Sequence, residues 1–395
     1  MKNIRQILGL AFMSLALTSM YGCELKTKKE TTKPVLAQVF LPDTNDRPKS
    51  NTVKIALLLD TSNSMDGLIN QAKSQLWDIV NKFTYAKCGN EQRPELQIAL
   101  YQYGNDNLSS REGYIQQVLN FSGDLDEISE KLFSLTTNGG EEYCGEVIHT
   151  SLKQLNWGDN PDNLKMIFIA GNEPFTQGKL NYKDAVTNAK EKDIVVNTIF
   201  CGNYEQGINS DWKNGATLTG GEYIAIDHNR KVVHIDTPYD DVIIHLNSKL
   251  NQTYISYGAM GSVKMEKQRT QDSNAYELEE AVAVKRAVSK SSRLYSNKNW
   301  DLVDALEDES FDIAMLEETE LPKELKGKSK TEMEAYVQEK KTERSKIQNE
   351  IQELNAKREK FIAEQQKEGE KGELENAMLE AIKKQAAKKN YKWEE

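Results

Sequence analysis

Apolar runs alternate with amphipathic segments along the chain from residue 51 to about residue 258. Runs of apolar and β-branched residues predict buried strands, and they lie at 53–59, 96–103, 114–121, 164–170, 193–201 and 220–226. Apolar residues three and four positions apart predict helices between them, at 67–86, from Asp124 onward, after the Gly-rich segment 136–143, before Asp193 and at 211–218. This alternation predicts a doubly wound α/β fold whose mostly parallel sheet is covered by helices on both faces.

Two further segments complete the predicted domain. The short GNDN turn at 104–107 favours an antiparallel pair of the strands on either side of it. Residues 231–236 predict a small added strand, and 237–258 predict an amphipathic helix that packs against the sheet. We therefore expect this domain to span 51–258.

Beyond the domain, strand signals vanish and charged helix formers dominate the sequence. The segment 274–308 predicts two helices broken near 296–299, with Trp300 in their packing face. We divide this part of the chain into a helical region at 259–330 and a charged helix at 331–395, where the segment around Leu374 and Ile382 forms a last amphipathic helix.

A heptad pattern occupies much of the charged helix. Its seam positions alternate at gaps of four and three residues, and they are Met333, Val337, Lys340, Arg344, Ile347, Ile351, Leu354, Arg358 and Phe361. Such a seam is typical of a coiled coil. Because three of these positions are basic, a weak dimer through 331–366 and a single long solvated helix both remain open interpretations.

The N-terminus has the layout of a secretory signal peptide. Lys2 and Arg5 precede an apolar run from Ile7 to Leu17, which is too short for a typical transmembrane helix. Gly22 directly before Cys23 resembles a bacterial lipobox, and that resemblance implies cleavage and lipidation at Cys23. Residues 24–50, rich in Lys, Thr and Pro, then predict a flexible tether.

The candidate chemistry lies in the stretch VKIALLLDTSNSM, from Val53 to Met65. Here a buried strand ends in Asp60, Ser62 and Ser64, whose alternate spacing allows all three oxygens to enter one hollow. Clustered hard oxygens suit Mg²⁺ or Mn²⁺. An ordinary Ser/Asn turn with a hydroxyl helix cap is the alternative interpretation.

The pattern DxSxS after an apolar strand resembles the first motif of the von Willebrand factor A domain, the metal-ion-dependent adhesion site. That resemblance implies a Rossmann-like fold and a threonine ligand, for which Thr136 and Thr137 are available and Thr137 is preferred. It also implies an aspartate after the fourth strand of that family, but this sequence has Asn172 there. Additional acidic ligands are then expected from Glu141, Glu142 or Glu173, and the cation from Mg²⁺, Mn²⁺ or Ca²⁺.

Charge and cysteine content narrow the interpretation further. The net charge of −10 over 395 residues does not suggest a nucleic-acid surface. Four cysteines include Cys23, and an oxidising compartment allows one disulfide among the others. Since Cys144 and Cys201 are both expected on the carboxyl side of the sheet, we expect them to pair, whereas Cys88 falls at the opposite end.

Phrases such as TNGGEEYCGEVI, FIAGNEPFTQG and NKNWDLVDAL resemble those of bacterial lipoproteins with a von Willebrand factor A domain. The resemblance implies a non-enzymatic protein, anchored to the bacterial cell envelope through Cys23 and facing the periplasm or the surface, whose metal captures an acidic side chain of a protein partner. Two alternatives remain: a metal-free scaffold acting through its helical region, and a metal-assisted hydrolase. No histidine is expected in a metal loop, which disfavours the hydrolase.

Overall fold

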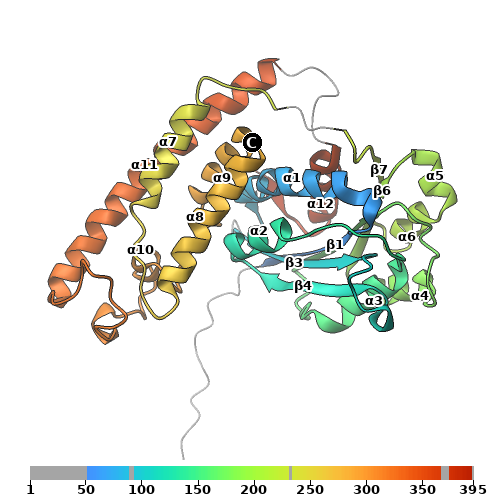
Figure 1. Cartoon of the computed structure of the whole chain (residues 1–395), viewed down its shortest axis with the longest axis horizontal. Helices are drawn as coiled ribbons and strands as arrows, with labels where there is room; N and C mark the ends of the chain where they lie inside the picture. Colours follow the sequence, from blue (N-terminus) through green and yellow to red (C-terminus); the bar gives the residue numbers. More distant parts are fainter. Residues whose placement is uncertain (1–50, 89–92, 231–233, 366–372, 394–395) are drawn as a thin grey trace, which may run out of the picture. The chain divides into compact units, whose positions relative to one another are not determined.

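A six-stranded sheet forms the centre of the computed structural model, which describes residues 51–88, 93–230, 234–365 and 373–393. The strand order is β4-β3-β1-β5-β6-β7, and β4 alone is antiparallel to its neighbour. The strands are β1 (Thr52–Asp60), β3 (Glu95–Tyr103), β4 (Ile115–Ser122), β5 (Leu164–Gly171), β6 (Val195–Cys201) and β7 (Tyr223–Ile226). The predicted doubly wound, mostly parallel α/β fold followed by a helical region is confirmed (Figure 1).

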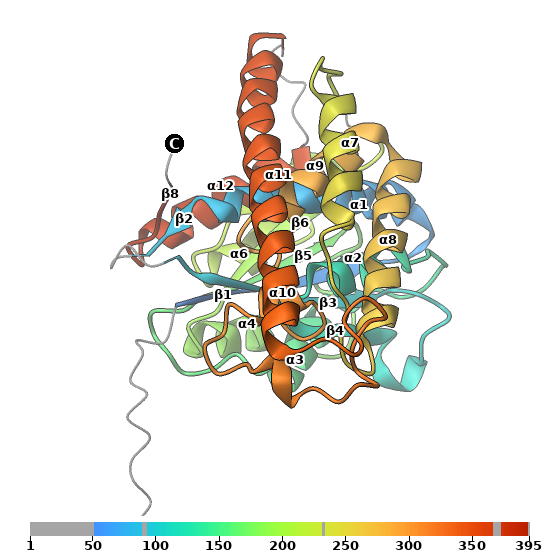
Figure 2. The ribbon, with the colours of Figure 1, turned by 90° about the vertical axis from the view of Figure 1, so that its left-hand side faces the viewer.

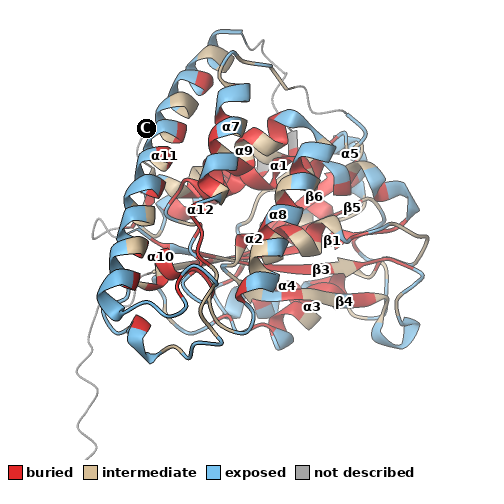
Figure 3. Ribbon diagram, turned by 60° about the vertical axis from the view of Figure 1, so that its left-hand side comes forward, coloured by how far each residue is buried: buried red, intermediate tan, exposed pale blue. Residues whose placement is uncertain are grey.

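Helices cover both faces of this sheet, as the predicted alternation requires. One face packs against α1 (Asp66–Thr84), α2 (Leu125–Phe133) and α12 (Glu373–Ala387). The other packs against α3 (Cys144–Gln154), α4 (Tyr182–Glu191) and α6 (Trp212–Thr217), while α5 (Tyr204–Asn209) adjoins α6 and β7. Figure 3 shows the resulting buried layers in red. Burial on both faces accounts for the almost uninterrupted apolar run of β1.

The last helix of the chain covers the sheet, whereas the sequence predicts that residues 237–258 do so. Helix α12 contacts β5 and β7, and its Gln385 exchanges hydrogen bonds with Asn197 of β6. A short strand after it, β8 (Lys392–Trp393), pairs antiparallel with β2 (Ala86–Lys87). Helix α7 (Asp240–Asn251), from the segment expected on the sheet, packs mainly against α9 and α11. That prediction is therefore wrong, because helix periodicity does not specify a helix's partner. Of the predicted strand at 231–236, residues 231–233 lie outside the described residues and 234–236 are not in a strand.

The helical region is broken across 296–299, as predicted, and it also has an earlier break at Glu279 that the sequence does not predict. Helix α8 (Gly261–Leu278) is separated from α9 (Glu280–Lys290) by Glu279, whose backbone is extended. A second break precedes the short helix α10 (Leu302–Ala305), and Trp300 is buried there as expected. The break at Glu279 lets α9 fold back against α8 and α1 at the same time. Three 3₁₀ turns complete the described elements: η1 (Asn63–Met65), η2 (Ser110–Glu112) and η3 (Ile313–Met315).

The heptad seam lies on the long helix α11 (Lys330–Gln365), and it packs against its own chain. Figure 2 shows α11 running beside α7. The basic seam position Arg344 donates to Asp301 at 2.6 Å and to Asp304 at 2.7 Å, and Arg358 donates to Asp240 at 2.8 Å. Neither the predicted dimer seam nor the single solvated helix describes this arrangement, because carboxylates of the same chain neutralise the buried arginines.

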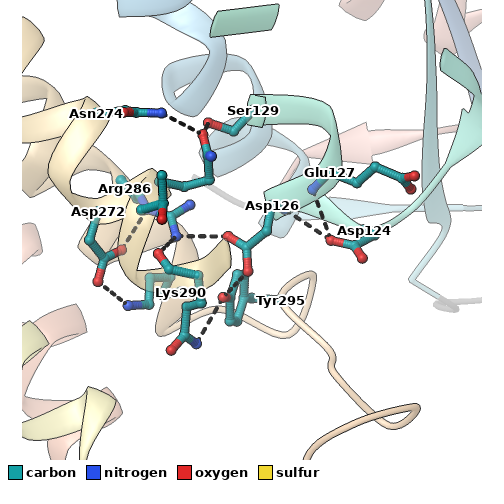
Figure 4. A network of polar contacts seen from close by, with 12 residues as sticks. Asp124, Asp126, Glu127, Ser129, Asp272, Asn274, Arg286, Lys290 and Tyr295 are labelled. Carbon is teal, nitrogen blue, oxygen red and sulfur yellow. Dashed lines mark hydrogen bonds and ion pairs between the residues drawn. The ribbon is translucent and has the colours of Figure 1, made fainter. Parts of the chain in front are cut away.

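A buried polar network joins the helical region to the sheet domain (Figure 4). Arg286 of α9 donates to Asp126 of α2 at 2.7 Å and to Asp272 of α8 at 2.6 Å. Its guanidinium also lies over the ring of Trp77, 4.9 Å from the centroid. Although burial alone would raise it, the positive charges of Lys290 and Arg286 hold the pKa of Asp272 below its usual range. The network therefore fixes how α8 and α9 dock on α1 and α2.

Within the described residues, no helix is both long and apolar enough to cross a membrane.

Arg286→Ala should lower the free energy of unfolding by about 3–5 kcal/mol, because it leaves Asp126 and Asp272 buried without their shared counter-charge. Urea denaturation followed by circular dichroism measures this. Arg269→Ala is the matched control on α8, since Arg269 is more than half exposed and its nearest carboxylate oxygen is 3.9 Å away; its expected effect is below about 0.5 kcal/mol. Equal effects of the two substitutions would contradict the assigned role of the network.

Candidate functional site

The DxSxS stretch forms a tight turn at the carboxyl end of β1, a central strand of the sheet. Asp60 is fully buried, and its Oδ1 accepts a hydrogen bond from the backbone N–H of Ser62 at 2.7 Å. The hydroxyl oxygens of Ser62 and Ser64 lie 3.4 Å apart. The chain then enters η1 and α1, so the oxygens of Asp60, Ser62 and Ser64 are held together between a strand end and a helix start, as the sequence predicts.

The loop between α2 and α3 brings Thr137 to this turn. The Thr137 hydroxyl donates to Asp66, the first residue of α1, and the N–H of Asn138 donates to the carbonyl of Thr61 at 3.0 Å. The side chain of Thr136 is exposed, and its carbonyl accepts a hydrogen bond from Asn105. Of the two threonines, Thr137 is the one whose hydroxyl contacts the start of α1, next to the DxSxS turn.

The loop after β5 brings Asn172 to the same place. The Asn172 amide nitrogen donates to the Ser64 hydroxyl at 3.1 Å, while its Oδ1 is buried without a hydrogen-bond partner in the described part of the chain. The preceding residue, Gly171, lies against Asp60, since a Cβ built there would be 3.1 Å from Asp60 Oδ2. No carboxylate from this loop enters the site.

Of the three additional acidic candidates, only Glu142 turns inward. Its side chain is buried, with 4% exposed, and lies beside Asp60. Glu141 and Glu173 are exposed, and Glu141 accepts a hydrogen bond from Tyr143. The loop before α3 therefore supplies a carboxyl group that the sequence could not distinguish from its neighbour.

The carboxyl groups of Asp60 and Glu142 lie close together at the end of β1, and keeping both of them ionised is unfavourable without a positive charge nearby. Burial raises the pKa of Asp60 and the pKa of Glu142, and the nearby charge of Asp60 raises that of Glu142 further. Two carboxyl groups in contact cannot both ionise at low cost in a buried place. Either a shared proton or a cation is needed to hold them together.

The residues present fit a hard divalent cation. When both carboxyl groups are ionised, three buried oxygens, Asp60 Oδ2, Glu142 Oε2 and Asn172 Oδ1, accept no hydrogen bond from the residues described. Together with the hydroxyls of Ser62, Ser64 and Thr137 they form an all-oxygen donor set, which suits Mg²⁺, Mn²⁺ or Ca²⁺. No group of three or more His, Cys, Asp or Glu side chains suited to a metal occurs in the described ranges, so neutral oxygens must complete any coordination here.

Two residues at the site escape sequence reasoning. Asn105 is almost fully buried, and its amide donates both to the Thr61 carbonyl and to the Thr136 carbonyl, which ties two loops together. His228 follows β7, and its Nε2 lies 3.1 Å from the carbonyl oxygen of Ser64. The expectation that no histidine lies at a metal loop is therefore wrong. A loop after an edge strand carried no sequence signal that it would fold back over the start of α1.

The Gln71 side chain explains the position of that histidine. Its amide nitrogen donates to the carbonyls of Asp227, His228 and Arg230 at 3.0 to 3.1 Å. A Cβ on Gly67 would lie 2.2 Å from the His228 carbonyl oxygen, so glycine permits the close approach. His228 is held by α1, and its contact with Ser64 supports the metal loop.

A polar hollow of about 570 Å³ adjoins these loops. Asn107, on its wall, accepts a hydrogen bond from the side chain of Asn138, the neighbour of Thr137. Glu112 of η2 lines it together with amide and hydroxyl groups from the turn before η2, the start of β4 and α3, which are those of Asn107, Ser109, Gln116, Gln117, Thr150 and Gln154. Hydrogen-bonding groups therefore extend the site toward the edge of the sheet.

The predicted disulfide between Cys144 and Cys201 is wrong. Both residues are buried free thiols. Cys144 packs in the core on the α3 face of the sheet, whereas Cys201 packs in the core on the α1 face. Both lie toward the carboxyl end of the strands, but the sheet separates them, because the alternation of side chains along a strand decides the face.

Comparison with known proteins agrees with the geometry of the site. Residues 54–213 match the family model described as the von Willebrand factor type A domain. Comparison with curated proteins gives no match.

Solved structures similar to this chain include one mussel protein and two bacterial proteins. Proximal thread matrix protein 1 from the mussel byssus has a TM-score of 0.35 and 14% identity, over 46% of this chain and 43% of that one. BatB of Bacteroides thetaiotaomicron has a TM-score of 0.34 and 15% identity, over 44% of this chain and 90% of that one. The pilus adhesin SpaC of Lactobacillus rhamnosus GG has a TM-score of 0.33 and 14% identity, over 45% of this chain and 28% of that one. The chain thus covers less than half of the mussel protein's length.

The raised pKa values of Asp60 and Glu142 predict how the metal-free protein responds to pH. The folded state holds a proton that the unfolded state loses near pH 4, so the free energy of unfolding should fall as pH rises above about 4. The Glu142→Gln substitution removes the part of this pH dependence that comes from the Glu142 carboxyl group. Urea denaturation in EDTA should show the variant gaining stability over the wild type as pH rises from 4 to 8. With Glu141→Gln, whose carboxyl is exposed, the difference should stay constant.

Proposed function

We propose that this protein, whose residues 54–213 match the von Willebrand factor type A domain, is a non-enzymatic binding protein that holds a protein partner through a divalent cation. The observation that carries the proposal is the set of three buried, unpartnered oxygens at the end of β1, counted over the residues described, beside three hydroxyl groups. A buried carboxylate oxygen that no hydrogen-bond donor reaches is costly, and a bound cation would remove that cost.

Some of these residues would offer neutral oxygen ligands to the cation, and Asp60 would offer negative charge. Ser62, Ser64 and Thr137 offer neutral hydroxyl oxygens, Asn172 offers its amide oxygen, and Asp60 offers negative charge. A bound Mg²⁺, Mn²⁺ or Ca²⁺ would supply an electrophilic centre that accepts a further oxygen ligand. An acidic side chain of the partner is the group we propose for that position, with the polar hollow at Asn107 receiving neutral groups beside it.

Hydrolysis finds less support from the same site. A metal-assisted hydrolase needs a positioned general base, and the nearest histidine, His228, has its Nε2 against the carbonyl of Ser64. A scaffold acting through the heptad seam also has little support, because α11 buries that seam within its own chain. Cation-dependent binding remains the function that uses the observed features.

We further propose that the protein is lipid-anchored to the cell envelope. The support is the sequence of residues 1–23, which lie outside the described residues. A diacyl anchor at Cys23 would bury methylene groups at about 0.8 kcal/mol each, and residues 24–50 would separate the domain from the membrane.

Lipidation predicts a membrane fraction that depends on one side chain. In a bacterial host, radiolabelled palmitate should enter the wild-type protein, and Cys23→Ala should abolish both labelling and membrane sedimentation. Cys88→Ala is the control, since Cys88 is a buried thiol of the folded domain. Label in the Cys23→Ala protein would contradict the proposed anchor.

Cation binding predicts the effect of replacing the central carboxylate. Asp60→Asn keeps an oxygen that accepts the Ser62 N–H but removes the charge, so the fold should persist while the affinity for Mg²⁺ or Mn²⁺ falls at least about tenfold. Isothermal titration measures the affinity, and circular dichroism checks the fold. Ser62→Ala/Ser64→Ala should weaken binding as well, whereas Ser134→Ala, an exposed serine after α2, should not. Absence of cation binding by the wild type would reject this function.

A further inference from the structure

The last residue of β5, Gly171, has no room for a side chain beside Asp60. A Cβ on Gly171 would lie 2.6 Å from the hydroxyl oxygen of Tyr103 and 3.1 Å from Asp60 Oδ2. Tyr103 cannot move aside easily, because it is fully buried and donates to the carbonyl of Ala170 at 2.9 Å. The position that directly faces Asp60 from β5 is therefore restricted to glycine.

Glu142 reaches Asp60 from the other side, and two glycines permit it. A Cβ on Gly104 would lie 2.6 Å from Glu142 Cγ and 2.9 Å from Asp60 Oδ1. Gly104 also has φ of +74°, a conformation that favours glycine. A Cβ on Gly140 would lie 2.4 Å from the Gly104 carbonyl oxygen, so glycine lets the loop before α3 pass this close to the end of β3. The local backbone is shaped around the Glu142 side chain.

The contact leaves two buried acceptor atoms that a shared proton or a cation can satisfy. Asp60 Oδ2 and Glu142 Oε2 are both buried and lack hydrogen-bond partners over the described ranges. The buried basic side chains of the fold lie elsewhere, with Arg286 and Lys290 on Asp126 and Asp272, and Arg344 on Asp301. Two carboxylates carry a charge of −2, which matches one divalent cation.

We propose that Glu142 is the second anionic ligand of the cation, supplied by the loop before α3 in place of an acidic residue after β5. The inference rests on the proposed function and adds a property to it. Because Asp60 and Glu142 together neutralise a divalent cation, the protein binds the cation without a partner, and the partner then adds a further oxygen ligand to a site that is already loaded.

Isothermal titration of the full-length protein with MgCl₂ and with MnCl₂ tests the inference, using Glu142→Gln and the matched control Glu141→Gln. Both variants lose one carboxylate at adjacent positions, but only Glu142 is buried beside Asp60. We expect Glu142→Gln to weaken cation affinity at least about tenfold, and Glu141→Gln to change it less than twofold. Glu142→Asp, which keeps the charge on a shorter side chain, should give an intermediate affinity.

Thermal unfolding gives a second readout that does not depend on a partner. Saturating Mn²⁺ should raise the melting temperature of the wild type and of Glu141→Gln, because a ligand that binds only the folded state stabilises it. It should raise that of Glu142→Gln much less at the same concentration. In EDTA, Glu142→Gln should melt no lower than the wild type, since a neutral amide of similar size lies beside Asp60 without the cost of a second buried carboxyl group, and this result shows that the variant is folded.

The outcomes separate the two proposals. Tight binding by the wild type with equal affinity in Glu142→Gln overturns the role of Glu142 and leaves the proposed function standing. No saturable binding of either cation by the wild type overturns both. Equal losses in Glu141→Gln and Glu142→Gln indicate a general charge effect and also overturn the assigned ligand.

Discussion

The burial of Asp60 at the carboxyl end of a central strand is the constraint on which the site depends. Strand β1 is flanked by β3 and β5 and covered on both faces, so its last side chain has no route to bulk water. A carboxylate in such a place must be protonated, paired or bound to a cation. The glycines that line it, the inward turn of Glu142 and the unpartnered oxygens around it are all arranged about this one group.

In the helical region several of the buried charged groups are arginines, and they too are paired with groups of opposite charge. Arg286, Arg344 and Arg358 are each nearly fully buried, and each is paired with at least one carboxylate of another helix or connecting segment. Buried ion pairs add little net stability over apolar contacts, yet removing one partner is costly. They therefore fix which helices meet, and the buried seam of α11 becomes specific for α7, α10 and the segment before it.

The two regions are connected through α2. Its N-terminal part carries Asp126, which Arg286 and Tyr295 hold, and its C-terminal end leads into the loop that supplies Thr137 and Glu142. Helix α12 also packs against α1, which is the helix that follows the DxSxS turn, and so helps to hold α1 in place. A binding site made of loops is thus supported by packed helices on each side, which limits the motion of its ligands.

The sequence alone determined the features that depend on local order. Periods of two and of three to four residues identified the six strands of the sheet and the helices between them. The spacing of Asp60, Ser62 and Ser64 identified one side of the site, because residues this close in the chain must also be close in space. The preference for Thr137 and the possibility of Glu142 also came from the sequence. Choosing Glu142 over Glu141 required the structure, because a one-residue difference decides whether a loop side chain faces the core or the solvent.

Only the tertiary structure decided contacts between distant segments. The position of α12 on the sheet, the folding back of His228 over Ser64 and the use of the α11 seam within the chain join residues more than 100 positions apart, and amphipathicity shows that a face is buried without showing against what. The same limit explains Cys144 and Cys201, which share one end of the sheet but lie on opposite faces. The local sequence pattern determined the helices, the strands and the DxSxS side of the site. Tertiary packing determined which elements contact each other and which glutamate lies beside Asp60.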